Sequence, residues 1–132
     1  MNISQRAVME ARDTKKKIRL RVGDQIVFAD VAFAPRDLED GLRNRESLAN
    51  EEGMLFVLGA NPQDAAFWMK GMKIPELEIL FLDAIGIVLS KSTMTTQNDT
   101  QLHRAHAASA YALEVLPTVG EAVDIGDQVK FI

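Results

Sequence analysis

Short apolar runs separated by turn residues are the feature that most constrains how this chain can fold. Residues 18–22 alternate apolar side chains with arginines, and this period of two predicts a strand with one apolar face. Gly23-Asp24 then predicts a two-residue hairpin turn, because glycine adopts the positive φ that such turns need. The return strand is expected over residues 26–32.

Similar runs continue to the end of the chain. Residues 54–58 are wholly apolar, which predicts a strand covered on both faces. Residues 93–103 are polar and predict a long loop. Further strands are expected at 65–69, 77–83, 87–89, 111–115 and 129–131.

Helical signals are few. Pro35 predicts the start of a short helix, because its fixed φ suits the first helical position. Residues 1–16 are expected to form an N-terminal arm, either mobile or a short frayed helix, ahead of a single globular domain over 17–132. The predicted fold class is α+β and β-rich: an antiparallel or mixed sheet forming a partly closed barrel or sandwich, with one or two short helices.

Composition excludes several classes of function. The chain has no cysteine, so disulfides, thiolate nucleophiles and cysteine metal sites are excluded. Its formal net charge of −4 provides no field to gather phosphates, and no nucleic-acid partner is expected. No apolar run is long enough to span a bilayer, so no membrane insertion is expected. The N-terminus shows no signal segment, which predicts a cytoplasmic location, although a chain whose signal had been removed would look the same.

Three blocks of sequence carry a family resemblance. They are Gly53-Met54-Leu55-Phe56, Phe67-Trp68-Met69-Lys70, and Tyr111-Ala112-Leu113-Glu114. In order and spacing the chain resembles the widespread prokaryotic family known as domain of unknown function 192. The resemblance implies a compact β-rich fold with short helices, and it implies no activity and no cofactor. Many members of that family are exported or lipid-anchored.

The chain departs from the family pattern in three places, one of which is a segment between Leu116 and Ile125 that is shorter than usual. Members usually read Gly-Leu-Met where this chain has Gly41-Leu42-Arg43. They usually place a leucine and an aspartate directly after the proline that stands here as Pro75. In this chain Glu76 intervenes, and Glu78 stands where the aspartate would be.

Trp68 and Lys70 are the first candidate site residues. Trp68 is the only tryptophan, and a large aromatic side chain is most often a core anchor. The alternative makes Trp68 the wall of a binding cleft, with Lys70 at its rim. Phe67 and Trp68 should point to opposite faces of a regular strand, so one could be core and the other cleft.

Three charged residues complete the candidate set. Glu78 lies within an apolar strand, where a carboxylate must be solvated, paired or protonated. Its expected role is an ion pair with Lys70 or Arg45, and the alternative is a general base with a raised pKa. Arg45 could join the helix to the sheet or hold an anionic ligand group. Asp83 is expected to cap the turn before Gly86. No ligand spacing supports a metal site, and neither a metal nor a cofactor is predicted.

His103 and His106 are the only histidines of the chain. Without an identifiable third ligand they make a weak zinc site. A solvent-exposed pair in a loop is the expected reading.

The sequence therefore predicts a small binding or accessory module that takes a small molecule or a peptide. Its cleft would be lined by Arg45, Trp68, Lys70, Glu78 and Asp83. One alternative is a hydrolase or isomerase that uses Glu78 or Asp83 as a base. Another is an assembly protein whose adaptable contact surface is supplied by methionines, namely Met54, Met69, Met72 and Met94.

Overall fold

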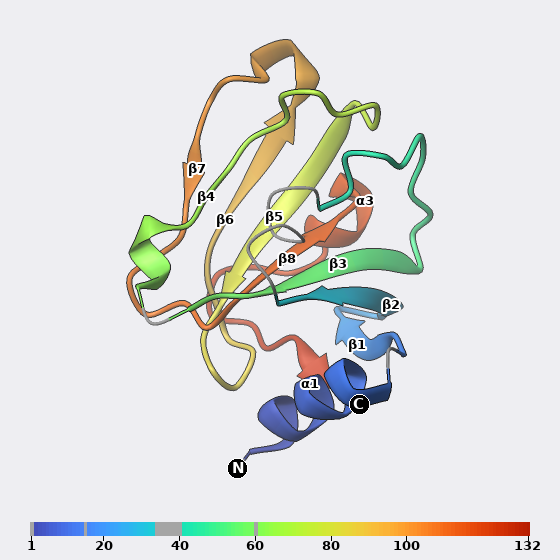
Figure 1. Cartoon of the computed structure of the whole chain (residues 1–132), viewed down its shortest axis with the longest axis vertical. Coiled ribbons are helices and arrows are strands. Elements are labelled where there is room, and N and C mark those ends of the chain that lie inside the picture. Colours follow the sequence, from blue (N-terminus) through green and yellow to red (C-terminus); the bar gives the residue numbers. More distant parts are fainter. Residues whose placement is uncertain (1, 15, 34–40, 60) are drawn as a thin grey trace.

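The computed structural model describes residues 2–14, 16–33, 41–59 and 61–132 of the chain. Its strands are β1 (Ile18–Val22), β2 (Gln25–Ala32), β3 (Glu52–Val57), β4 (Ala66–Phe67), β5 (Glu76–Leu82), β6 (Val88–Thr95), β7 (His103–Arg104), β8 (Tyr111–Val115) and β9 (Lys130–Phe131). Seven of them form one curled sheet in the order β6-β5-β8-β3-β2-β1-β9, and β4 pairs with β7 in a separate ribbon (Figure 1). The prediction of a β-rich, partly closed fold is confirmed.

The sheet is mixed. Strands β2 and β3 pair in parallel, with Ala29 opposite Gly53, and every other pair of neighbouring strands is antiparallel. The predicted hairpin is present: β1 and β2 are joined through Gly23, whose φ is +60°. A side-chain carbon at Gly53 would lie 2.9 Å from the backbone oxygen of Glu114, so glycine permits close packing there.

Two sequence-based strand predictions were wrong in extent. Strand β6 continues to Thr95, into the polar stretch that was expected to be a loop. Strand β6 lies at one edge of the sheet and pairs with β5 on its inner side. Its side chains can therefore stay polar. The strand expected over 65–69 is only the two residues of β4, because the chain turns away into a loop after Phe67.

Residues near the start of the chain form helix α1 (Ile3–Thr14). The Asn2 side chain accepts a 2.8 Å hydrogen bond from the Gln5 N–H, as an N-cap does. Val8 and Ala11 are buried against the sheet, and the Ser4 hydroxyl donates to the Ala84 carbonyl.

The other helices are short. Helix α3 (Pro117–Gly120) begins at a proline, and two 3-10 turns lie at Pro62–Asp64 and Thr96–Asn98. The helix expected at Pro35 falls outside the described residues. Across the described part of the chain, no helix has the length and apolarity needed to cross a membrane.

Both faces of the sheet are buried. The main core draws on all seven strands together with α1 and α3, and includes Val8, Leu20, Val27, Leu55, Leu80, Leu113 and Val119. The second core lies on the opposite face and includes Leu42, Phe56, Phe67, Met69, Ile79 and Ala112. Leu55 and Phe56 enter different cores, which confirms that the apolar run at 54–58 is covered on both sides.

A short set of backbone contacts draws the two ends of the sheet together. Ile87, just before β6, bridges Gln128, just before β9. The Val88 N–H donates to the Asp127 carbonyl at 2.8 Å, and the Val129 N–H donates to the Gly86 carbonyl at 2.8 Å. Gly86 has a φ of +92°, and a side-chain carbon there would overlap the Val129 carbonyl oxygen. The closure therefore requires glycine at this position.

We expect Gly86→Ala to lower the free energy of unfolding by at least about 2 kcal/mol more than Gly126→Ala. Gly126→Ala is the control, because Gly126 has a similar φ of +96° but open space around it. The difference between the two variants therefore measures the clash with Val129 apart from the backbone strain. Chemical denaturation of both variants would measure the difference. Equal losses would show that the contact between Gly86 and Val129 does not restrain the sheet.

Candidate functional site

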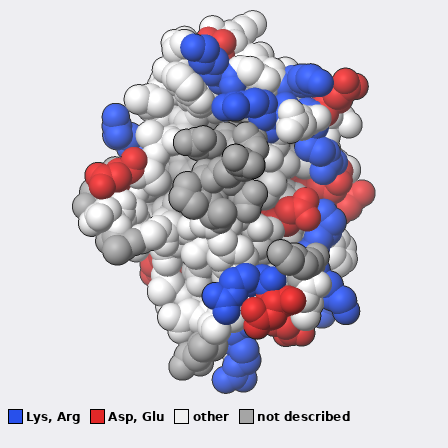
Figure 2. Space-filling model, viewed as in Figure 1, with Lys and Arg blue, Asp and Glu red and all other residues white. Residues whose placement is uncertain are grey.

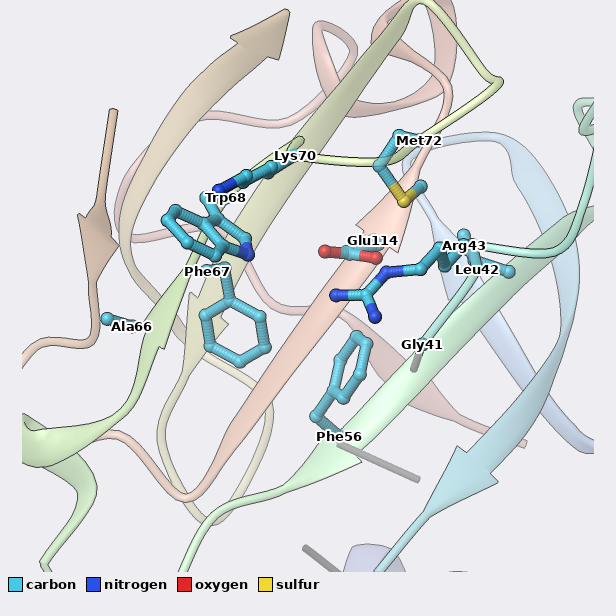
Figure 3. A pocket seen from close by; sticks show the side chains of 10 residues that line it. All are labelled: Gly41, Leu42, Arg43, Phe56, Ala66, Phe67, Trp68, Lys70, Met72 and Glu114. Carbon is cyan, nitrogen blue, oxygen red and sulfur yellow. The ribbon is translucent and has the colours of Figure 1, made fainter. Parts of the chain in front are cut away.

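A pocket of about 350 Å³ opens on the face of the sheet that carries the second core. Two loop segments and three strands, β3, β4 and β8, contribute its walls (Figure 3). Its lining residues are Gly41, Leu42, Arg43, Phe56, Ala66, Phe67, Trp68, Lys70, Met72 and Glu114. This volume lies within the range of natural small-ligand sites, near its lower end.

Glu114 is the buried acid of this pocket. It lies in β8, directly opposite Ile79 of β5 and Met54 of β3, so its side chain shares their face of the sheet. Its exposed fraction is 5%, and no hydrogen bond or ion pair joins its carboxyl group to another described residue. Burial of the side chain disfavours its charged form and raises the pKa of the Glu114 carboxyl to about 8.

Aromatic rings form the opposite wall. Phe67 meets Phe56 edge to face, with ring centroids 5.0 Å apart, and lies 5.9 Å from Phe81. Trp68, the next residue after Phe67, is 40% exposed, and the Lys70 Nζ lies 5.3 Å from the centroid of its ring. Phe67 therefore belongs to the second core, whereas Trp68 is partly exposed and lines the pocket.

Arg43 brings a second cation to the same pocket. Its guanidinium group extends into the space between Glu114 and the aromatic rings (Figure 3). A side-chain carbon at Gly71 would lie 3.6 Å from the Arg43 Cδ, so the stem of the arginine packs along that loop. A side-chain carbon at Gly41 would lie 3.2 Å from the Phe56 ring and 4.0 Å from the Glu114 Oε1. Glycine at position 41 therefore keeps the backbone close to the acid.

Of the five predicted site residues, Trp68 and Lys70 line the pocket together. Glu78 does not, because it lies one residue from Ile79 and projects to the main-core face of the sheet. Its carboxylate accepts a 2.7 Å hydrogen bond from the Thr93 hydroxyl, in place of the predicted ion pair with Lys70 or Arg45. Gly120 packs directly against its side chain.

Arg45 and Asp83 also lie away from the pocket. Arg45 donates to Glu52 at 2.7 Å, and this hydrogen bond, followed by one from the Ala49 N–H, lowers the pKa of the Glu52 carboxyl. Asp83 accepts hydrogen bonds from the N–H groups of Ile85 and Ile87 at 3.0 and 2.9 Å. It stabilises the turn before Gly86, as the sequence predicted.

The two histidines occupy different environments. His103 is buried in β7, contrary to the expectation of an exposed loop, and its Nδ1 lies 2.6 Å from the Ser92 hydroxyl. Burial lowers the pKa of its imidazole. His106 is exposed. Within the described residues, no group of three or more acidic or histidine side chains could hold a metal ion.

Glu114 and Arg43 are the charged pocket residues that sequence reasoning missed. Glu114 lies in the apolar strand Tyr111–Val115, and the argument that singled out Glu78 applied to it equally. Arg43 was visible as the departure from the Gly-Leu-Met pattern at positions 41–43. Neither signal revealed that the two residues share a pocket.

Comparison with known proteins supports the resemblance found in the sequence. The model of the DUF192 family, described as an uncharacterized ACR, matches residues 17–131. No curated protein matches the chain.

Two solved structures share the fold. One is a candidate transcription regulator from Sinorhizobium meliloti 1021, 24% identical, with a TM-score of 0.75 over 88% of this chain and 92% of that chain. The other is a protein of unknown function from Novosphingobium aromaticivorans DSM 12444, also 24% identical, with a TM-score of 0.71 over 87% and 84%. At this identity the likeness establishes the fold alone.

We expect Trp68→Ala to cost roughly 1–2 kcal/mol of unfolding free energy, because much of the side chain is in water. Phe67→Ala should cost about 3–5 kcal/mol, because it leaves a cavity in the second core. Urea denaturation of the two adjacent variants would compare them directly. A larger loss for Trp68→Ala would mean that the tryptophan is a core anchor instead of a pocket wall.

A second prediction concerns the pH dependence of stability. The folded protein keeps Glu114 protonated up to about pH 8, whereas the unfolded chain loses this proton above its ordinary value of 4.5. This carboxyl group therefore destabilises the fold progressively as pH rises from 4.5 to 8. We expect Glu114→Gln to stabilise the protein by on the order of 3 kcal/mol at pH 8, and by little at pH 4.5.

Thermal unfolding of wild type and variant across this pH range would measure the effect, with the exposed Glu51→Gln as the control. A stability difference for Glu114→Gln that does not change with pH would contradict it.

Proposed function

Since the chain belongs to the DUF192 family, we propose its function from the chemistry of its own pocket: it is a small-molecule binding module. One observation carries this proposal. Glu114 is almost fully buried, lines a cavity and is hydrogen-bonded to no other described residue. A buried polar group without a partner costs stability, so a protein that keeps one in a cavity gains most when a ligand satisfies it.

The shape of the pocket supports the same role. An apolar cavity of about 150 Å³ is already large enough for benzene, so about 350 Å³ accommodates a single-ring molecule with polar substituents. Its aromatic walls offer flat apolar contact, and its few polar groups converge from separate segments. Such a combination is typical of small-ligand sites.

The enzymatic alternative has less support. The carboxylates expected to act as a base, Glu78 and Asp83, already accept hydrogen bonds from Thr93 and from the turn N–H groups. Neither of them lines the pocket. Neither Glu78 nor Asp83 is therefore placed to act as a base on a molecule held in this pocket.

The assembly alternative is weakened, because two of the four methionines proposed as its contact surface are buried. Met69 and Met94 are fully buried in the second core and are not available to a partner. On the face shown in Figure 2, basic and acidic side chains are intermingled around the rim instead of forming a field of one sign. Such a face gives no electrostatic reason to prefer a large charged partner.

Trp68 provides the test of the binding proposal, because it is the sole tryptophan and lines the pocket. We expect a library of single-ring compounds to yield ligands that change its fluorescence and raise the melting temperature. Trp68→Phe should abolish the optical signal and keep the thermal shift, since an aromatic wall remains.

A variant whose pocket is filled by a larger side chain serves as the control. Ala66→Phe adds a ring at the pocket wall and should remove both signals, whereas Ala108→Phe, which is exposed and lies outside the pocket lining, should leave them unchanged. Ligands that bind equally to wild type and Ala66→Phe would show that binding occurs elsewhere. A library without ligands for the wild type would count against the proposed function itself.

A further inference from the structure

The charges around the pocket determine which kind of molecule it suits. Among the described lining residues, Arg43 and Lys70 are the cations and Glu114 is the acid. With Glu114 neutral, no described lining residue carries a negative charge, and Lys70 places a positive charge beside the Trp68 ring. In that state the lining favours an anion over a cation.

Lys70 also occupies the position that a cationic ligand would need. Its ammonium group lies 5.3 Å from the centroid of the Trp68 ring, which is where an aromatic wall attracts positive charge. A second cation placed there would be repelled by Lys70. The free remainder of the aromatic wall, Phe56 and Phe67, suits a flat uncharged ring.

We propose, on the basis of the binding function above, that the ligand is a small aromatic or otherwise flat organic oxyanion. One oxygen of its anionic group would accept a hydrogen bond from the protonated Glu114 carboxyl group. Lys70 would offset its charge, and its flat body would lie against Phe56 and Phe67. A carboxylate and a phosphate monoester share this chemistry.

The surroundings of Glu114 explain why it can act as a donor. The neighbours that pair with it across the sheet, Met54 and Ile79, carry no charge, and neither does Phe56 beside them. Among the described residues, the other charged groups that line its pocket are Arg43 and Lys70, while Glu52, near the start of β3, is engaged with Arg45. Burial raises the pKa of Glu114 to about 8, so at neutral pH the group carries the proton that it would donate.

Proton linkage follows from this arrangement. An oxyanion bound beside Glu114 requires the neutral carboxyl group, because two adjacent anions would repel each other. The dissociation constant should therefore rise about tenfold for each pH unit above about 8. A cationic ligand would show the opposite trend, since ionised Glu114 would attract it.

The experiment uses one ring with four head groups: benzoate, phenyl phosphate, benzamide and benzyltrimethylammonium. Each is titrated into the full chain from about pH 6 to about pH 9.5, with Trp68 fluorescence and calorimetry as readouts. We expect benzoate or phenyl phosphate to bind at least tenfold more tightly than the neutral and cationic probes at pH 7. The tighter of these two anions identifies the head group.

The Glu114→Gln variant separates the donor role from the general attraction of the cations. Its amide keeps an N–H donor but does not titrate in this range, so anion binding should persist and lose its decline above pH 8. Glu114→Leu removes the donor and should weaken anion binding at least tenfold at pH 7. A decline above pH 8 that survives in Glu114→Gln would overturn the role given to this residue.

The outcomes distinguish this inference from the proposed function. Preferential binding of benzyltrimethylammonium or benzamide in the pocket would overturn the oxyanion inference and leave the binding function standing. The same holds if every library ligand that binds in the pocket is cationic or uncharged. Absence of binding by any probe or library compound would overturn both.

Discussion

Burial of both faces of the curled sheet is the constraint on which the rest of the structure depends. Strand β8 lies between β5 and β3, so each of its side chains must enter one of two apolar cores. Leu113 fills the main core, and Glu114, one residue later, is carried to the opposite face. An acidic residue in a central strand with both faces covered cannot reach bulk water without distorting the sheet. The pocket beside it leaves room for a polar partner.

The same geometry explains why Glu78 and Glu114 differ although their sequence settings are alike. Both interrupt apolar strands, and β5 and β8 are direct neighbours. The register places Glu114 opposite Ile79 and Glu78 opposite Val115, so the two carboxyl groups lie on opposite faces. Thr93 satisfies one of them, whereas the other faces a cavity. This distinction rests on strand pairing and not on composition.

Much of the fold could be predicted from local pattern. Alternation identified the hairpin of β1 and β2, the wholly apolar run of β3 indicated coverage on both faces, and Asp83 was recognised as a turn residue. The polar edge strand β6 was only partly recognised, because a strand paired on one side needs no apolar period. Two of the four pocket residues on which the proposals rest were predicted from the sequence. Trp68 and Lys70 were found as neighbours in sequence, whereas Arg43 and Glu114 join them through contacts between distant segments.

The binding and proton-linkage proposals both require that Glu114 be a protonated carboxyl group facing a cavity at neutral pH. Carbon-13 NMR of the protein labelled at the glutamate side-chain carboxyl carbons measures this protonation, with the Glu114 resonance assigned by its loss in Glu114→Gln. The expected titration midpoint is about 8, shifted upward when benzoate is bound. A midpoint near the ordinary value of 4.5 would contradict it, because Glu114 would then be an anion at neutral pH.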